Sequence, residues 1–375
     1  MLYYSAHFFW LYGYPMRQLA ALLPLALLLS ACSSTPKPAD ITAQPTSSGG
    51  FLLEPQHAVH PLSGDFANNP NTARFIDQMV RKHGFDRQQL HDVLDQAQRL
   101  DYVLRLMNQQ APTPKTPGQQ QRPSGPNGAW LRYSKKFITP DNVQNGVAFW
   151  NQYEGALERA YATYGVPPEI VVGIIGVETR WGRVMGKTRI IDALATLAFD
   201  YPRRAEYFSG ELETFLLMSR AEGRDPLSLR GSFAGAMGYG QFMPSAFKEY
   251  AVDFDGDGHV DLWNPVDAIG SVAHYFAAHG WVKNGTVAVQ ASGQAPLMQQ
   301  GYTTKYTVGA LSAAGLRPLS PLRDDQQVSL LRLDIGTAYQ YWYGLPNFYV
   351  ITRYNHSTHY AMAVWQLGEA VSRAR

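Results

Sequence analysis

The stretch VPPEIVVGIIGVETRWG constrains the fold more than any other part of the chain. Its residues from Ile170 to Val177 are apolar on every side of a helix, which is typical of a helix buried inside a domain. One acid, Glu178, follows directly. A desolvated, unpaired carboxylate is costly, so such a group tends to keep its proton, and a neutral carboxylic acid beside a cleft suits general acid catalysis. A structural glutamate that caps a neighbouring loop, or pairs with Arg180 or Arg183, explains its position equally well.

The composition describes a folded body of two or three domains: 375 residues, 45% hydrophobic, 17% charged, with a net charge of +2. This balance argues against a polyanion-binding protein, and clusters such as YPRRAEYF are too small for the basic surface of a nucleic-acid binder. We therefore expect no nucleic-acid partner. The 22 Tyr and 8 Trp residues could stack on flat-faced ligands such as sugars, although a large core accounts for most of them.

The N-terminus carries a secretion signal. Arg17, an apolar run and a small-residue ending precede Cys32, the one cysteine of the chain, and the run is too short for a permanent membrane helix. A disulfide framework is excluded. The L-S-A-C ending resembles a lipobox, whose cysteine is lipidated, although a plain signal peptide with an incidental cysteine is the alternative. Ser33, directly after the cysteine, resembles the lipoproteins that are sorted to the outer membrane. The aromatic-rich residues before Met16 are unlike the start of a signal peptide and favour Met16 as the true start. We expect residues 1–32 to be the signal and the protein to be lipid-anchored at the periplasmic face of the outer membrane.

Residues 33–61 are rich in Ser, Thr, Pro and Gly and are expected to form a flexible tether. Residues 62–122 contain NTARFIDQMVRKHG and DRQQLHDVLDQAQRLDYVLRLM, each with the apolar spacing of a helix, followed by a Pro/Gln/Gly-rich linker. They predict an N-terminal helical region.

The segment ITPDNVQNGVAFWNQYEGALERAYATYG predicts one helix that ends at Gly165, with Thr139 as N-cap and Pro140 at the first helical position. Beyond Trp281, shorter segments such as GTVAVQASG and QQVSLLRLDIG predict a small β-containing region over residues 281–340. Residues 341–375 end in a last helix, HYAMAVWQLGEAV. The expected fold class is mainly α, of the α+β kind.

Two long motifs resemble the lytic transglycosylase B family, which consists of membrane-anchored, murein-cleaving enzymes with a lysozyme-like catalytic core. The motifs are E-T-x-x-G at Glu178–Gly182 and G-Y-G-Q-F-M-P-S at Gly238–Ser245, and the resemblance extends from about Pro123 to the last helix. It implies a lysozyme-like core over residues 123–280, an additional helical domain, and Glu178 as the sole catalytic acid and base.

Most glycosidases use two carboxylates. The loop FAGAMGYGQFMPS supplies none. A lytic transglycosylase needs only one: Glu178 would protonate the oxygen of the β-1,4 bond between N-acetylmuramic acid and N-acetylglucosamine. It would then accept the proton of the muramoyl C6 hydroxyl as a 1,6-anhydro ring closes, while the substrate's N-acetyl group stabilises the cationic intermediate.

Two alternatives stay open. A lysozyme-like hydrolase would use Asp192, Asp200 or Glu206 as a second carboxylate, and a non-catalytic murein-binding lipoprotein would use none. No cofactor is expected for catalysis. The expected partners are murein glycan strands and outer-membrane lipid, other cell-wall enzymes are candidates, and the chain is expected to be a monomer.

The expected cleft combines a glycine-rich loop with aromatic residues. Gly235, Gly238 and Gly240 would let the backbone approach a saccharide, while Ser232 and Gln241 offer hydrogen bonds to hydroxyl and acetamido groups. The resemblance implies a full set of cleft residues: Tyr133, Ser232, Gln241, Tyr275, Tyr354, Asn355 and Tyr360.

The segment DFDGDGHVDLWNPVD, residues 253–267, starts as an EF-hand loop does, with three alternating aspartates, a turn glycine and a residue that offers its backbone carbonyl. Its twelfth position is Asn264 instead of a bidentate glutamate, so an ordinary EF-hand fails there. The resemblance implies an extended loop closed by Asp267. We expect a structural calcium site, with a plain acidic turn as the alternative; the expected ligands are Asp253, Asp255, Asp257, His259 and Asp267.

Overall fold

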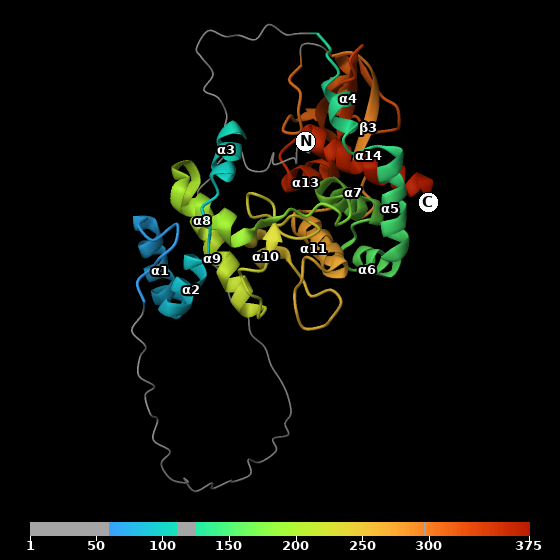
Figure 1. Ribbon diagram of the computed structural model, residues 1–375. Helices are drawn as coiled ribbons and strands as arrows, with labels where there is room; N and C mark the ends of the chain where they lie inside the picture. Colours follow the sequence, from blue (N-terminus) through green and yellow to red (C-terminus); the bar gives the residue numbers. More distant parts are fainter. Residues whose placement is uncertain (1–59, 111–124, 296–297) are drawn as a thin grey trace, which may run out of the picture. The chain divides into compact units, whose positions relative to one another are not determined.

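The apolar stretch forms helix α7, Pro168–Thr179, in the computed structural model, which describes residues 60–110, 125–295 and 298–375 (Figure 1). Every residue from Ile170 to Val177 is buried, as the sequence predicts. The expected signal with Cys32, the tether as far as residue 59, and the linker from residue 111 lie outside the described residues.

Helix α14, Thr358–Ala374, packs against α7 at backbone contact distance. A Cβ atom on Gly173 would lie 2.3 Å from the carbonyl oxygen of Val364, and one on Gly368 would lie 2.1 Å from that of Glu169. Any side chain at either glycine would therefore force the two helices apart. This contact holds the first turn of α14 beside the C-terminal end of α7.

Helices α5 (Pro140–Gln152) and α6 (Glu154–Tyr164) correct the prediction of one continuous helix. Tyr153 separates them with φ −116° and ψ 24°, outside the helical region. The predicted N-cap is confirmed, because the Thr139 side chain accepts a hydrogen bond from the backbone N–H of Asn142. Both helices and α11, Pro265–Ala278, pack on α7.

The first and third of the N-terminal helices pack on α8, Ile190–Asp200, and α8 packs on α9, Ala205–Ala221. The segment predicted as one helix after residue 86 is two helices, because α8 side chains take the backbone donors between them. Gln98 N–H donates to Asp192 and Leu100 N–H donates to Thr196, both at 3.0 Å. The N-terminal helices are α1 (Pro70–His83), α2 (Arg87–Asp95) and α3 (Asp101–Gln110).

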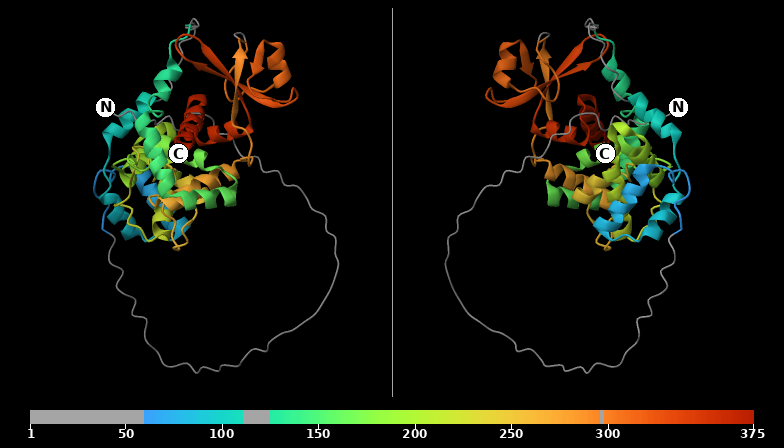
Figure 2. Two further views of the ribbon diagram at one scale, coloured as in Figure 1. Left: turned by 90° about the vertical axis from the view of Figure 1, so that its right-hand side faces the viewer. Right: turned by 90° about the vertical axis from the view of Figure 1, so that its left-hand side faces the viewer.

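Five antiparallel strands form a sheet in the order β4-β6-β7-β3-β5, and α12 (Val308–Ala313) accompanies them (Figure 2). The sheet has its own hydrophobic cluster, which includes Leu316, Leu330 and Tyr343. It extends past the boundary expected at residue 340, because β7 pairs along β6 and β3 as far as Gly344. The strands are β3 (Ala288–Gly293), β4 (Tyr306–Thr307), β5 (Leu316–Pro318), β6 (Gln327–Asp334) and β7 (Tyr339–Gly344).

Short elements complete the described fold: α4 (Ala129–Ser134), the paired strands β1 (Thr188–Arg189) and β2 (Arg230–Gly231), the 3-10 helix η1 (Pro202–Arg204), α10 (Pro244–Tyr250) and α13 (Pro346–Tyr354). Within the described ranges no single helix is long and apolar enough to cross a bilayer. Helices α6 and α7 meet that test as a pair, bent by 116° at the break between them.

Candidate active site

Glu178 lies in the last turn of α7 and is partly exposed as a whole residue. The hydroxyl of Tyr360, in the first turn of α14, donates a hydrogen bond of 2.5 Å to Glu178 Oε1. Burial raises the pKa of Glu178 to about 8, and the Tyr360 hydrogen bond opposes that rise. Glu178 is therefore mostly protonated at neutral pH, the state that a general acid requires.

The chain leaves α7 through a backbone conformation that explains the E-T-x-x-G motif. Arg180, Trp181 and Gly182 have φ values of 51°, 56° and 82°, a left-handed run that is strained for the two residues with side chains. The Thr179 hydroxyl stabilises it by accepting the Gly182 N–H at 3.1 Å. Trp181 is held by its indole N–H, which donates to the carbonyl of Val172. In the described part of the chain, no arginine pairs with Glu178, so the ion-paired alternative finds no support.

The glycine-rich loop packs directly on the end of α7. Thr179 Oγ1 lies 2.9 Å from the carbonyl oxygen of Tyr239, to which it can donate, and a Cβ atom on Gly182 would lie 2.4 Å from the Tyr239 ring. A Cβ atom on Gly238 would meet the carbonyl of Leu262 at 2.2 Å. These glycines are therefore required by protein contacts, in addition to any approach of a saccharide.

Ser232 and Gln241 hold the loop itself. Ser232 Oγ accepts the N–H groups of Ala234 and Ala236 at 3.2 and 2.9 Å. Gln241, at φ 53°, donates from Nε2 to the carbonyls of Met185 and Gly238 at 3.2 and 2.9 Å. Part of the hydrogen-bonding capacity that we assigned to substrate is thus used to shape the loop.

Three of the expected cleft tyrosines gather around Glu178. Tyr133 comes from α4, Tyr354 ends α13 and Tyr360 begins α14. Burial raises the pKa of each hydroxyl, and the negative charge of an ionised Glu178 raises it further. These phenols therefore stay neutral. Tyr360 donates to the acid itself, whereas the Tyr354 hydroxyl donates to the backbone carbonyl of Gly240 at 2.5 Å.

Tyr275 and Asn355 both adjoin Tyr354, the first through a ring contact and the second as the next residue of the chain. The Tyr275 ring contacts the Tyr354 ring edge-on, with centroids 4.8 Å apart, and its hydroxyl donates to the backbone carbonyl of Arg353 at 2.8 Å. Asn355 follows α13 directly and is buried. The structure therefore gives Tyr275 a clear supporting contact to the Tyr354 ring.

None of the three candidate second carboxylates acts on Glu178. Asp192 is paired twice with Arg189, with both N–O distances at 2.8 Å. Asp200 accepts hydrogen bonds from Asn69 and Arg99, and Glu206 is exposed at the start of α9. Burial and Tyr360 alone shift the pKa of Glu178 among the described residues.

Asp334 supports the helix that carries Tyr133, a role that the sequence does not indicate. The Asp334 carboxylate, at the end of β6, accepts the N–H groups of Asn127 and Gly128 where α4 begins, the latter at 2.7 Å. Burial works against its ionisation, but these and neighbouring N–H groups outweigh burial and lower the pKa of Asp334 to about 2. The rings of Tyr133 and His359 lie 5.5 Å apart. No local pattern indicates a bond that spans 206 positions.

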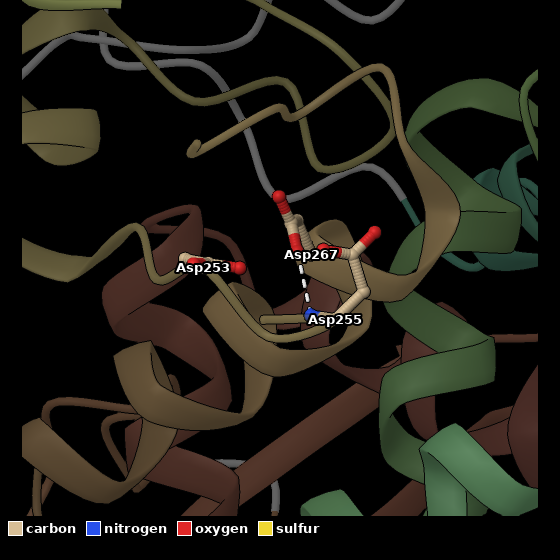
Figure 3. A group of neighbouring side chains, drawn as sticks. All are labelled: Asp253, Asp255 and Asp267. Carbon is tan, nitrogen blue, oxygen red and sulfur yellow. Dashed lines mark hydrogen bonds between the residues drawn. The ribbon is translucent and has the colours of Figure 1, made fainter. Parts of the chain in front are cut away.

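The acidic loop brings together Asp253, Asp255 and Asp267, whose nearest carboxylate oxygens lie within 4.8 Å of one another (Figure 3). Asp267 is buried and accepts the N–H groups of Phe254 and Asp255 through Oδ1 and that of Asp261 through Oδ2. Three carboxylates so close together repel one another unless a cation neutralises them.

The other residues of the loop lie differently. Asp257 is outside this group, and its Oδ1 accepts the N–H of His259. The imidazole Nδ1 of His259 lies 3.5 Å from Glu222 Oε2. Asn264 caps α11 and donates to Asp255 Oδ2 at 2.5 Å. Asn264 thus also contacts the group through Asp255, while its Oδ1 accepts the Val266 N–H in the α11 cap.

The family described as the transglycosylase SLT domain matches residues 67–369, most of the chain. This chain belongs to the transglycosylase SLT domain family. It is 73% identical over 360 residues to the membrane-bound lytic murein transglycosylase B of Escherichia coli strain K12, covering 96% of this chain and 99% of that protein.

Two solved structures of a relative are similar to the structure of this chain. The Escherichia coli lytic transglycosylase Slt35 in complex with bulgecin A has a TM-score of 0.81 at 73% identity, covering 86% of this chain and 99% of the other. The same enzyme in complex with calcium has a TM-score of 0.80 at 72% identity, with the same coverage. The expected mainly α fold with a lysozyme-like core is confirmed.

Proposed function

We propose that this SLT-domain protein is a lytic transglycosylase that cleaves murein between N-acetylmuramic acid and N-acetylglucosamine and leaves 1,6-anhydromuramic acid ends. The observation that carries this proposal is Glu178, a carboxylic acid held protonated among tyrosines, with no second carboxylate acting on it among the described residues. The relatives bear names of the same activity.

The first step is proton donation. With Tyr360 hydrogen-bonded to Oε1, the proton of Glu178 belongs on Oε2, from which it passes to the glycosidic oxygen as the bond to the muramoyl C1 breaks. The departing sugar takes this proton and becomes an alcohol. The Tyr360 hydrogen bond then stabilises the newly formed Glu178 carboxylate.

The second step returns the proton. The muramoyl C6 hydroxyl attacks C1, closes the 1,6-anhydro ring and gives its proton to Glu178, while the N-acetyl carbonyl of the substrate stabilises the cationic carbon until then. Water is not consumed, so one acid is sufficient. Ser232 and Gln241 shape the glycine-rich loop at the cleft. Tyr275 packs on Tyr354, one of the three tyrosines around the acid.

Product analysis tests this reaction. Purified sacculi digested by the wild-type protein should yield muropeptides lighter by one water than those with reducing ends, as measured by mass spectrometry. Glu178→Gln keeps the shape of the side chain but cannot donate the proton, so turnover should be lost while sacculus binding persists. Reducing-end products would establish the hydrolase instead, and normal turnover by Glu178→Gln would exclude the single-acid mechanism.

We also propose a structural calcium ion at the acidic loop, held by the carboxylates of Asp253, Asp255 and Asp267. Three convergent carboxylates suit this cation, since calcium prefers several oxygen ligands in a flexible arrangement. The ion would tie the loop to Asp267 in the first turn of α11. The same helix carries Tyr275 near its other end. Asp257 and the backbone carbonyl of His259 stay proposed ligands from the sequence. A relative of this chain was solved with calcium.

The position of the protein in the cell follows from its N-terminus and from the membrane-bound relative. We infer a lipid anchor at Cys32 on the periplasmic face of the outer membrane, with a monomeric enzyme acting on nearby murein. Cys32→Ser should move the protein from the membrane fraction to the soluble fraction without loss of activity. Continued sedimentation with the outer membrane would exclude the lipobox.

A further inference from the structure

A buried carboxylate that the proposed reaction does not use holds the end of the glycine-rich loop. Glu211, in α9, is only 2% exposed. Its Oε2 accepts the backbone N–H of Ser245 at 2.8 Å, and its Oε1 accepts the Ser245 hydroxyl at 2.6 Å. Ser245 is the last residue of the G-Y-G-Q-F-M-P-S motif and lies at the start of α10. Two donors of one motif residue thus meet a single buried carboxylate.

The loop is held at its beginning, its middle and its end by different groups. At the beginning, a backbone bridge joins Gly231 to Met237. Near the middle, the Tyr354 hydroxyl donates to the carbonyl of Gly240 at 2.5 Å. The end is held by the carboxylate of Glu211. Of these three contacts, only the last involves a group that is charged as a carboxylate and neutral as an acid.

Gln241 lies between the middle contact and the end of the loop. Its φ of 53° is strained for a residue with a side chain, so the chain on both sides has to hold it in place. Residues 242–244, which connect it to Ser245, are buried, and the proline that starts α10 is among them. This short and tightly packed connection transmits a displacement of Ser245 to Gln241. The carboxylate of Glu211 therefore controls the part of the loop that Gln241 shapes.

The surroundings of Glu211 make its charge sensitive to acid. Burial raises the pKa of Glu211, and the two donors of Ser245, the Tyr207 hydroxyl and the positive charge of Arg204 oppose this rise without cancelling it. Tyr207 and Arg204 are the titratable groups that face the carboxyl group, and the Arg204 guanidinium lies 4.0 Å from the centre of the Tyr207 ring. A protonated Glu211 keeps its shape but loses the charge-assisted part of its bond to Ser245.

We propose that Glu211 is a positioning residue for the reaction, because its carboxylate fixes the end of the glycine-rich loop and thereby the wall of the cleft that Gln241 shapes. This inference rests on the proposed function and adds a residue to it. Glu211 acts through Ser245 and leaves the proton transfer to Glu178. Its loss therefore weakens the hold of the cleft on a glycan strand, which raises KM, and leaves kcat in place.

Binding tests this role without turnover. In the Glu178→Gln protein, calorimetry would measure binding of the disaccharide N-acetylglucosaminyl-N-acetylmuramic acid with Glu211 intact and with Glu211→Gln. Glutamine has the shape of the protonated acid, so the loop stays packed but loses the charge-assisted bond, and binding should weaken roughly three- to tenfold.

Glu213→Gln is the matched control, because Glu213 lies on the same helix but binds a different partner. It accepts from Lys82 and His83 of α1 at 2.8 and 2.7 Å and has no printed contact with the glycine-rich loop. Glu213→Gln should therefore lower the melting temperature without changing the affinity for the disaccharide.

Kinetics provides the second measurement. With Glu178 intact, Glu211→Gln should raise KM for murein glycan strands by the same factor and leave kcat unchanged. As the general acid, Glu178 stays active when protonated, so it does not lower kcat/KM in acid. The wild-type kcat/KM should nevertheless fall in acid as Glu211 takes up a proton, and this fall should be absent from Glu211→Gln.

Ser245 supplies a second set of variants for the same contact. Ser245→Thr keeps both donors and should retain the wild-type KM, whereas Ser245→Ala keeps only the backbone N–H and should raise KM. In the double variant with Glu211→Gln, the two increases should not add in free energy, because both changes weaken one contact.

Two outcomes would overturn the proposal. Unchanged affinity and KM in Glu211→Gln would show that the loop keeps its place without the carboxylate. An equal loss of affinity in Glu213→Gln would show that lowered stability, and not the loop, is the cause. Failure of the wild-type protein to form anhydro ends would overturn the proposed reaction and not the role of Glu211, because the binding measurement requires no turnover.

Discussion

The hydroxyl of Tyr360 reaches Oε1 of Glu178 at 2.5 Å, although the two residues are 182 positions apart in the chain. This bond lowers the pKa of Glu178, while burial raises it more strongly. The protonation state of the acid is therefore set by the packing of α14 on α7, which in turn depends on Gly173 and Gly368.

The first prediction concerns pH and Tyr360. Because Glu178 must be protonated to act, kcat/KM should fall on the alkaline side with a midpoint near pH 8. Tyr360→Phe removes the bond that favours the carboxylate, so the midpoint should move to higher pH. Tyr349→Phe, at an exposed tyrosine of α13, should leave the profile unchanged. A profile that moves to lower pH in Tyr360→Phe would contradict the role of this bond.

The second prediction concerns stability. The pKa of Glu178 is raised in the folded state, so the native protein binds more protons than the unfolded one between about pH 4.5 and 8. Its contribution to stability is complete below pH 4.5 and is lost as pH rises through 8. Glu178→Gln cannot ionise, so its free energy of unfolding at pH 8.5 should exceed that of the wild type by on the order of 1–3 kcal/mol. This figure is smaller than the full pKa shift implies, because the residue is partly exposed. Denaturant unfolding at pH 4 and pH 8.5 measures this, and a gain of equal size at both would refute it.

The third prediction concerns Asp334, a positioning residue that acts through α4. Asp334→Asn removes the charge that caps α4, so Tyr133 should lose its fixed position and kcat/KM should fall roughly tenfold. Its effect on the melting temperature should vanish below about pH 2, where the wild-type carboxylate is itself protonated. Asp325→Asn, at an exposed aspartate just before β6, is the control. Full activity of Asp334→Asn would show that Tyr133 keeps its place without the cap.

The fourth prediction concerns calcium. Binding to the folded state should raise the melting temperature by an amount that grows with calcium concentration. Asp267→Asn should remove most of the difference between calcium and chelator, and should also lower stability without calcium, because Asp267 accepts backbone N–H groups of the loop. Asn264→Ala should cost about 1 kcal/mol through loss of the α11 cap and keep the calcium difference. The reverse ranking would show that Asn264 closes the site. Magnesium should raise the melting temperature less than calcium does, because it demands stricter octahedral geometry.

The sequence alone determined those features that depend on neighbouring residues. The all-round apolar run defined α7, Thr139 and Pro140 defined the start of α5, and β-branched segments located β3 and β6. Each of these sequence patterns lies within the helix or strand that it predicts, or directly beside it. The positions of Glu178 and of the three alternating aspartates were visible for the same reason.

Only the tertiary structure decided which distant groups meet. Helices α2 and α3 are separate because α8 side chains take the backbone donors between them, and local spacing contains no trace of α8. The raised pKa of Glu178 requires burial by the packed chain, which outweighs the opposing hydrogen bond from Tyr360. The cap on α4 requires Asp334 from a strand far along the chain. These properties are desolvation and long-range hydrogen bonding, which do not exist until the chain has packed.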